Sequence, residues 1–191
     1  GDSHSTNGWN NVDGHHLGPR LCYNFGKKKL EVCDIRVFKK INDGDILIFS
    51  FGEIDCRCHV HKHINENNSY QKIIDSIVEN YFDAIKLNIE VSRLSFKFIC
   101  VYNIVPPIQR DNTEENPDFP FLGTDEERKM YTLYFNKQLQ KKCWENNYIF
   151  FDIYDKYTDD NGFLRKDLSD GKVHIRDGKY ITEFINNYLL L

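Results

Sequence analysis

The chain has 191 residues, enough for one domain with a substantial core, and its formal net charge is −4 at pH 7. A mildly acidic chain is a poor match for nucleic acid or for an anionic membrane, so we expect neither as a partner. No stretch of the sequence approaches the ~20 consecutive apolar residues that a membrane-spanning helix needs. Three of the six cysteines, Cys22, Cys33 and Cys100, lie in apolar or strand-like contexts, which favours free thiols and a cytoplasmic location.

Short apolar runs recur along the chain with helical patterns between them. This alternation predicts an α/β fold with a parallel sheet. The runs are bounded by polar or turn residues, as strands usually are. The expected strands are 29–35, 45–51, 96–101 and 148–153. No internal repeat or linker interrupts the pattern, so we expect a single domain over 1–191.

Three helices are expected from their spacing and their start signals. Asn68 or Ser69 can cap a long helix whose apolar residues follow helical spacing. The sequence at 124–127 is a capping box that opens a second helix, and 180–190 forms the last. The proline-containing segment 103–123 is expected to be a loop that could form the rim of a substrate site.

The two ends of the chain hold the parts of a nucleophilic catalyst. Ser3 follows Gly-Asp, a common turn sequence, and can present its hydroxyl where a helix begins. Asp170 and His174 stand on a predicted loop before the last helix, and they could supply a base and the group that orients it. The informative feature is the order of these residues, with the serine first and the aspartate and histidine close together far downstream. His4 would point away from Ser3 on a helix, and we interpret it as a polar residue of the helix start.

Charged residues are concentrated after the second predicted strand. Glu53, Asp55 and Arg57 come shortly after the apolar run 45–49. In open α/β sheets ligands bind beyond the carboxyl ends of the strands, so these side chains are predicted to lie at a site. His59 follows them and could contact substrate.

Taken in order, these segments and 15–20 resemble the SGNH (GDSL-type) hydrolase superfamily. The similarity is greatest to a branch with GDSHS, HHLGPR, FGEIDCR and a late DG-x-VH motif, and it covers nearly the whole chain. It implies a flavodoxin-like three-layer α/β/α sandwich and esterase, deacetylase or acyltransferase activity without a cofactor. It also implies that Ser3 is the nucleophile, His174 the base and Asp170 its partner. Gly18 would donate a backbone amide to the oxyanion hole.

One position of the third motif departs from the superfamily. Ile54 stands where an asparagine usually donates to the oxyanion, and an isoleucine side chain cannot donate. Loss of one such donor typically costs ~10²–10³ in turnover unless another group replaces it. The guanidinium of Arg57 could replace it. Alternatively, Arg57 could form an ion pair with Asp55 or Glu53.

The spacing at both ends of the chain differs as well. Three residues separate Asp170 from His174 where the superfamily usually has two, and a turn at Gly171 could absorb the extra residue. The superfamily's nucleophile follows a buried strand, whereas only two residues precede Ser3 here. We therefore expect the first strand to be missing and the chain to be part of a longer one.

Several functions remain compatible with these residues. The main hypothesis is a serine esterase or deacylase whose substrate is an acylated carbohydrate or small molecule. An O-acyltransferase acting on glycans would use the same groups, and a non-catalytic glycan-binding module would account for Ile54. The cysteines and histidines over 56–63 suggest a zinc site, but no second cluster completes a four-ligand set, so we expect no metal.

Overall fold

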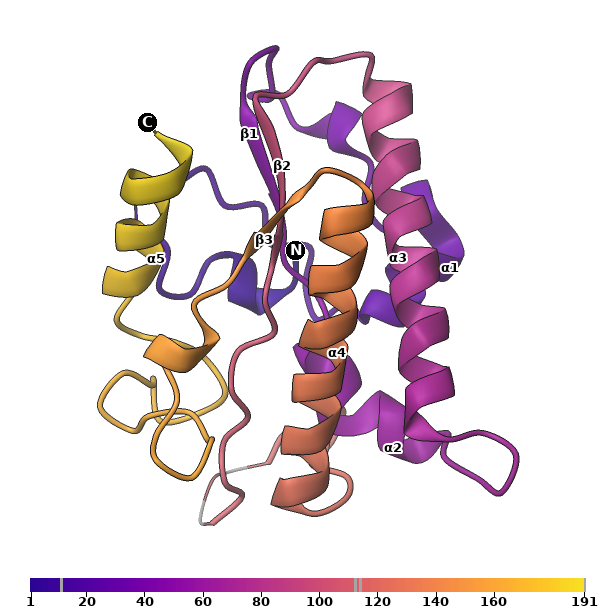
Figure 1. Ribbon diagram of the computed structural model, residues 1–191, viewed down its shortest axis with the longest axis vertical. Helices are drawn as coiled ribbons and strands as arrows, with labels where there is room; N and C mark the ends of the chain where they lie inside the picture. The colour runs from indigo at the N-terminus through magenta and orange to yellow at the C-terminus, as the bar shows by residue number, and fades with distance from the viewer. Residues whose placement is uncertain (11, 112, 114, 191) are drawn as a thin grey trace.

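The computed structural model describes the whole chain except Asn11, Asn112, Glu114 and Leu191. Within the described residues, three parallel strands form one sheet in the order β1 (Ile46–Phe49), β2 (Phe98–Tyr102) and β3 (Ile149–Phe151). The register places Ile46 opposite Phe98 and Cys100 opposite Ile149. Long helices connect successive strands, as parallel pairing requires (Figure 1).

Helices cover both faces of this sheet. On one side lie α1 (Cys22–Lys28), α3 (Tyr70–Ser92) and α4 (Asp125–Glu145), with the short α2 (Val60–Lys62) below them (Figure 1). On the other side lies α5 (Lys179–Phe184), which continues into a π-helical turn. The predicted three-layer α/β/α arrangement with a parallel sheet is therefore confirmed.

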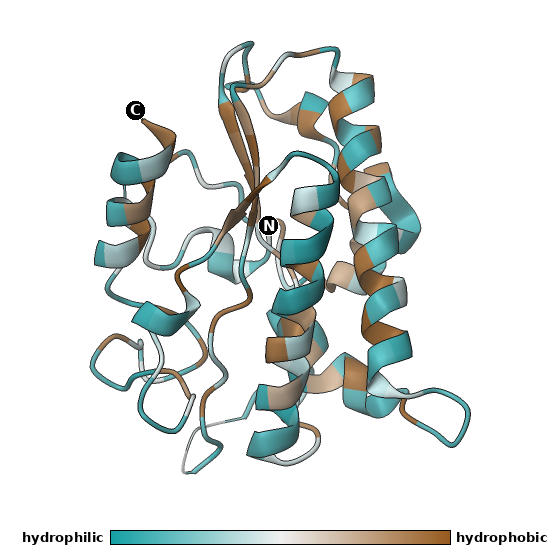
Figure 2. Cartoon of the chain, in the orientation of Figure 1, coloured by the Kyte–Doolittle hydropathy of each residue, from teal (hydrophilic) through white to brown (hydrophobic). Residues whose placement is uncertain are grey.

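The strands themselves show why two helical layers are needed. Alternate residues of a strand point to opposite faces. In β2, Val101 joins the core beneath α1, α3 and α4, whereas Cys100 and Tyr102 join the core beneath α5. The strands are accordingly the most continuously hydrophobic segments, while the helices carry polar residues along their outer sides (Figure 2). In the part of the chain that the structure describes, no helix has the length and apolarity to cross a membrane.

Both predicted helix starts are confirmed. The Ser69 hydroxyl accepts the backbone N–H of Lys72 at 3.4 Å and caps α3. At the start of α4, Thr124 and Glu127 form the full capping box, each side chain accepting the backbone N–H of the other at 3.1 and 2.7 Å. These local hydrogen bonds are encoded in short sequence windows, which is why the sequence predicts them.

The strand predicted at 29–35 is wrong. Lys29–Glu31 and Ile35–Val37 are short 3₁₀ turns. The backbone N–H of Ile35 donates to the Asn88 side chain of α3 at 3.0 Å, and the Ile35 side chain is buried. A short apolar run can satisfy its backbone and bury its side chains in more than one way, and here packing against α3 replaces strand pairing.

Candidate active site

The turn that carries Ser3 is fixed to the end of β1. Ser3–Ser5 forms one 3₁₀ turn, capped by the Asp2 side chain, which accepts the backbone N–H of His4 at 2.9 Å. The backbone N–H of Asp2 donates to the carbonyl of Ser50, one residue beyond β1, at 3.1 Å. The turn therefore lies at the carboxyl end of the sheet, where ligand sites of such folds occur.

The loop that carries His174 is a tight, internally bonded turn. Ser169 and Ile175 form an antiparallel bridge at its base. Within it, one carboxylate oxygen of Asp170 accepts the backbone N–H groups of Lys172 and His174 at 2.8 and 3.2 Å. Gly171 adopts a φ of +84°, a conformation that favours glycine, and so accommodates the extra residue between Asp170 and His174.

The structure brings the two ends of the chain together in one hydrogen-bonded relay. The Ser3 hydroxyl lies 2.9 Å from Nε2 of His174, and Nδ1 of His174 lies 2.8 Å from a carboxylate oxygen of Asp170. The carboxylate can only accept, so Nδ1 carries the proton and Nε2 is left to accept the serine hydroxyl. Ser3 and His174 are 171 residues apart in the sequence.

The protonation states of this relay suit proton transfer. Partial burial lowers the pKa of His174, the nearby charge of His4 lowers it further, and Asp170 offsets only part of this decrease. Burial alone would raise the pKa of Asp170, but hydrogen bonds from the His174 ring and from backbone N–H groups hold it below its ordinary value. At neutral pH Asp170 is therefore ionised and His174 neutral, the state a general base requires.

A cavity of about 510 Å³ opens beside the relay. Ser3 and His174 lie in its wall, together with apolar side chains and two cationic ones. These other lining residues include Ile54, Arg57, Phe119, Phe121 and Lys172. The sequence predicted a rim over 103–123, and residues 113, 115–117, 119 and 121 contribute to the wall. Within this rim the sequence did not single out Phe119 or Phe121, and Lys172 was not predicted, because no local motif marks them.

Two backbone amides near this cavity are free to donate. Neither Ser3 nor Gly18 donates its N–H to another residue of the described chain. Gly18 has a φ of +79°, and open space surrounds the position that a Cβ would occupy. Its neighbours His16 and Pro19 line the cavity, and the N–H of Leu17 donates to the carbonyl of Gly1 at 2.9 Å. The segment with Gly18 is thus attached to the turn that carries Ser3.

Arg57 lies in the cavity wall with Glu53 behind it. Their side chains form an ion pair at 3.2 Å, and both are almost completely buried. The Arg57 guanidinium lies 5.7 Å from the centre of the Phe121 ring, and its Nε has no hydrogen-bond partner among the described residues. The ion pair foreseen for Arg57 is therefore present with Glu53, and its role as an oxyanion donor stays a prediction.

Asp55 does not line the cavity, which corrects its assignment to a substrate site. It is fully buried, and its two carboxylate oxygens accept the backbone N–H groups of Cys22 and Tyr23 at 2.6 and 3.0 Å. These are the first residues of α1, so Asp55 caps that helix from a distant part of the chain. Burial raises the pKa of Asp55 to about 7, although the two N–H groups favour the ionised form.

His59 also lies outside this cavity, so the structure does not support its predicted contact with substrate. Asp55–His59 forms a π-helical turn, and the His59 ring packs between Tyr23 and His63 at 4.5 and 4.4 Å. Burial, followed by the neighbouring cations, lowers the pKa of His59 to about 4. Among the described residues, no group of three or more cysteine, histidine or acidic side chains is arranged to hold a metal ion.

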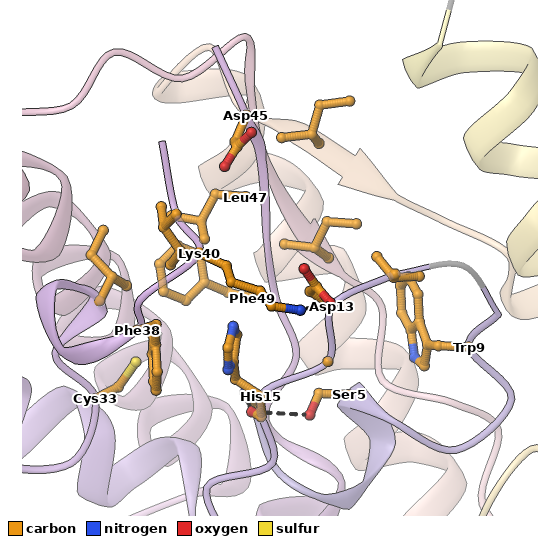
Figure 3. A pocket seen from close by; sticks show the side chains of 17 residues that line it. Ser5, Trp9, Asp13, His15, Cys33, Phe38, Lys40, Asp45, Leu47 and Phe49 are labelled. Carbon is orange, nitrogen blue, oxygen red and sulfur yellow. Dashed lines mark hydrogen bonds and ion pairs between the residues drawn. The ribbon is translucent and has the colours of Figure 1, made fainter. Parts of the chain in front are cut away.

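A second hollow, of about 310 Å³, lies along β1 and is separate from the relay. Figure 3 shows Leu47 and Phe49 of β1 in its wall, facing the stacked rings of His15 and Phe38, which lie 4.3 Å apart. Neither Ser3 nor His174 belongs to the described lining. Most of the described side chains in this wall are apolar, and among them no serine or cysteine is hydrogen-bonded to a histidine ring.

Comparisons with known proteins bear on the fold. A solved structure, described as that of a candidate platelet activating factor from Streptococcus pneumonia, is similar to this chain with a TM-score of 0.58 and 16% sequence identity. The match covers 92% of this chain and 72% of the other. No family model matches the sequence, and no curated protein matches it. At this identity the likeness concerns the fold alone.

Proposed function

We propose that this chain is a serine hydrolase of the SGNH type that cleaves the ester of an acylated carbohydrate or small molecule. The observation that carries the proposal is the relay from Ser3 through His174 to Asp170, with 2.9 and 2.8 Å contacts, at the wall of an open cavity. The residues of this relay are those that the sequence motifs pick out, and the α/β/α fold is the one the resemblance implies.

The first half of the reaction forms an acyl-enzyme. Nε2 of His174 accepts the Ser3 proton as Oγ attacks the ester carbonyl carbon. Asp170 keeps the proton on Nδ1 and stabilises the imidazolium that forms. The imidazolium then gives its Nε2 proton to the departing alkoxide, which leaves as an alcohol and leaves the acyl group on Ser3.

The second half releases the acid. A water molecule gives a proton to Nε2 of His174 and attacks the acyl carbonyl carbon. Collapse of the tetrahedral intermediate breaks the bond to Ser3, whose oxygen recovers the proton from His174. A sugar hydroxyl in place of water would complete an acyl transfer instead, so the same residues would serve an O-acyltransferase.

Charge on the tetrahedral oxygen needs donors, and the chain offers three. The free amides of Ser3 and Gly18 are the first two, in line with the general design of oxyanion holes. Ile54 lines the cavity but supplies no donor, which favours Arg57 as the third. Ile54 and Phe119 give the wall apolar surface suited to a short acyl group.

The test separates an enzyme from a binding module. We would measure hydrolysis of p-nitrophenyl acetate and of acetylated sugars, and labelling by a fluorophosphonate, which forms a bond from Oγ to phosphorus with loss of fluoride. Ser3→Ala should abolish both signals, whereas Ser76→Ala, an exposed serine on α3, should keep them. If wild-type protein and Ser3→Ala are equally inert in every assay, the hydrolase proposal fails and a glycan-binding role gains support.

A further inference from the structure

His4, one residue after the proposed nucleophile, is buried rather than exposed at a helix start. Its side chain is 5% exposed. Nε2 of its ring lies 3.0 Å from the carbonyl oxygen of Val173, the residue before His174. A carbonyl oxygen can only accept, so Nε2 of His4 carries a proton and donates. The turn and the late loop are therefore joined twice, by Ser3 with His174 and by His4 with Val173.

The other ring nitrogen of His4 faces a buried carboxylate. Nδ1 lies 3.4 Å from Oδ1 of Asp2, whose side chain is 1% exposed. That oxygen already accepts the backbone N–H of His4, and neither Nδ1 nor Oδ2 of Asp2 has a hydrogen-bond partner among the described residues. A buried carboxylate without a full set of donors is costly unless a positive charge lies beside it. A protonated His4 provides that charge.

The charges around His4 agree with this state. Burial alone would lower the pKa of His4, but its contact with Asp2, the charge of Glu53 and the bond to Val173 together raise it to about 9. The His174 ring also faces it, with its centre 4.9 Å away and Asp170 on the far side of that ring, and Asp2 in turn interacts with Asp55 and with the N-terminal amine of Gly1. The positive charge of His4 lowers the pKa of His174.

We propose that His4 and Asp2 form a positioning pair, in which a buried imidazolium holds the late loop by Val173 and keeps His174 neutral and ready to accept the Ser3 proton. This role rests on the proposed function. His4 would not touch the reacting atoms; it would act through His174. The pair would thus set the lower pH limit of Ser3 activation, because a like charge 4.9 Å away opposes protonation of His174.

Two substitutions separate charge from packing. His4→Gln keeps a side-chain donor for Val173 and removes the charge. Asp2→Asn keeps an acceptor for the His4 backbone N–H and removes the carboxylate that retains the His4 proton. His61→Asn is the matched control, since His61 also makes a side-chain hydrogen bond, to Tyr131 at 3.1 Å, but lies outside the cavity lining.

The readout is the rate of fluorophosphonate labelling of Ser3 as a function of pH. For His4→Gln and Asp2→Asn we expect the rise of this rate to move to higher pH, so that labelling at pH 6 relative to pH 8 falls about threefold below wild type. His61→Asn should follow the wild-type profile. A uniform loss at every pH in both variants would indicate a merely structural role and overturn the proposal.

A second measurement does not depend on activity or on a variant that folds. Imidazole resonances of wild-type protein, followed by NMR against pH, should show His4 titrating near 9 and His174 below the ordinary range of histidine. A His4 that titrates near 6.5 or below would overturn the positioning pair. A wild-type protein with these titrations but no labelling at Ser3 would retain the pair and overturn the proposed function.

Discussion

Two groups of polar residues lie near the carboxyl end of the sheet, and they differ in burial and in access to the cavity. Ser3 and His174 are half-buried at the wall of an open cavity, and the exposed Asp170 is hydrogen-bonded to His174 behind them. Asp55, in contrast, is fully buried and accepts two backbone N–H groups, and the mostly buried Glu53 forms an ion pair with Arg57. A charged motif after a strand therefore predicts where a site lies in the fold. Whether a side chain can take part in chemistry there depends on its access to the cavity.

Substitution of Asp170 should show the largest difference between the two groups, because it should affect activity and leave stability almost unchanged. Asp170→Asn would present an amide to Nδ1 of His174 and favour the tautomer that cannot accept the Ser3 proton. We expect kcat/KM for p-nitrophenyl acetate to fall ~10²–10⁴-fold with little change in stability. Asp167→Asn is the matched control, because Asp167 is an exposed carboxylate three residues away that forms an ion pair with Arg165. Equal activity of Asp170→Asn and wild type would remove Asp170 from the relay.

The buried pair of Asp2 and His4 should make stability depend on pH. The pKa of His4 in the folded chain, about 9, exceeds its ordinary value of 6.5, so the native state binds this proton more tightly. The resulting stabilisation is fully present below pH 6.5 and is lost as pH rises through 9. It amounts to on the order of 3 kcal/mol. Urea unfolding at pH 6 and pH 9.5 measures it, and His4→Gln should show a much smaller difference between the two.

Arg57 lines the cavity and also pairs with Glu53, so its substitution tests which of these two contacts the site requires. Arg57→Met keeps an unbranched side chain against Phe121 and removes every donor. We expect kcat/KM to fall ~10–10²-fold. This loss is smaller than for removal of a sole oxyanion donor, because the backbone amides of Ser3 and Gly18 remain. Glu53→Gln serves as the comparison, since it breaks the ion pair but leaves Arg57 in place. If Glu53→Gln loses as much activity as Arg57→Met, the ion pair and not the guanidinium is what the site requires.

Asp55 should affect stability without affecting the chemistry. Asp55→Asn retains one acceptor but turns an amide N–H toward a backbone N–H of α1. We expect the free energy of unfolding to fall by ~1–3 kcal/mol, measured by urea titration. Labelling of Ser3 below the unfolding transition should stay at the wild-type rate. A large loss of labelling in a fully folded Asp55→Asn protein would return this residue to the active site.

Local signals predict what local interactions decide. The caps at Ser69 and Thr124 and the apolar runs of β1, β2 and β3 are set by neighbouring residues, and the sequence predicts them. The meeting of Ser3 with His174 comes from a resemblance to a superfamily rather than from periodicity, because no local pattern relates positions so far apart. Their catalytic roles stay predictions.

What the sequence does not predict depends on tertiary burial. The run 29–35 packs against α3 instead of pairing, and Asp55 finds its donors at the start of α1, 33 residues away. The residues beside His4 in the sequence would be the same whether its side chain were exposed at a helix start or buried beside Asp2. Only the position of Val173 and the depth of Asp2 in the fold distinguish the two cases.

The distribution of the relay over the chain has a consequence for biosynthesis. Ser3 is synthesised before His174, which follows 171 residues later in the chain. Until the loop with His174 emerges and docks, the serine hydroxyl has no base and is no more reactive than that of an ordinary alcohol. A chain that stops before His174 would therefore hold the serine without its base, and the proposed relay would form only after the late loop has been made and has docked.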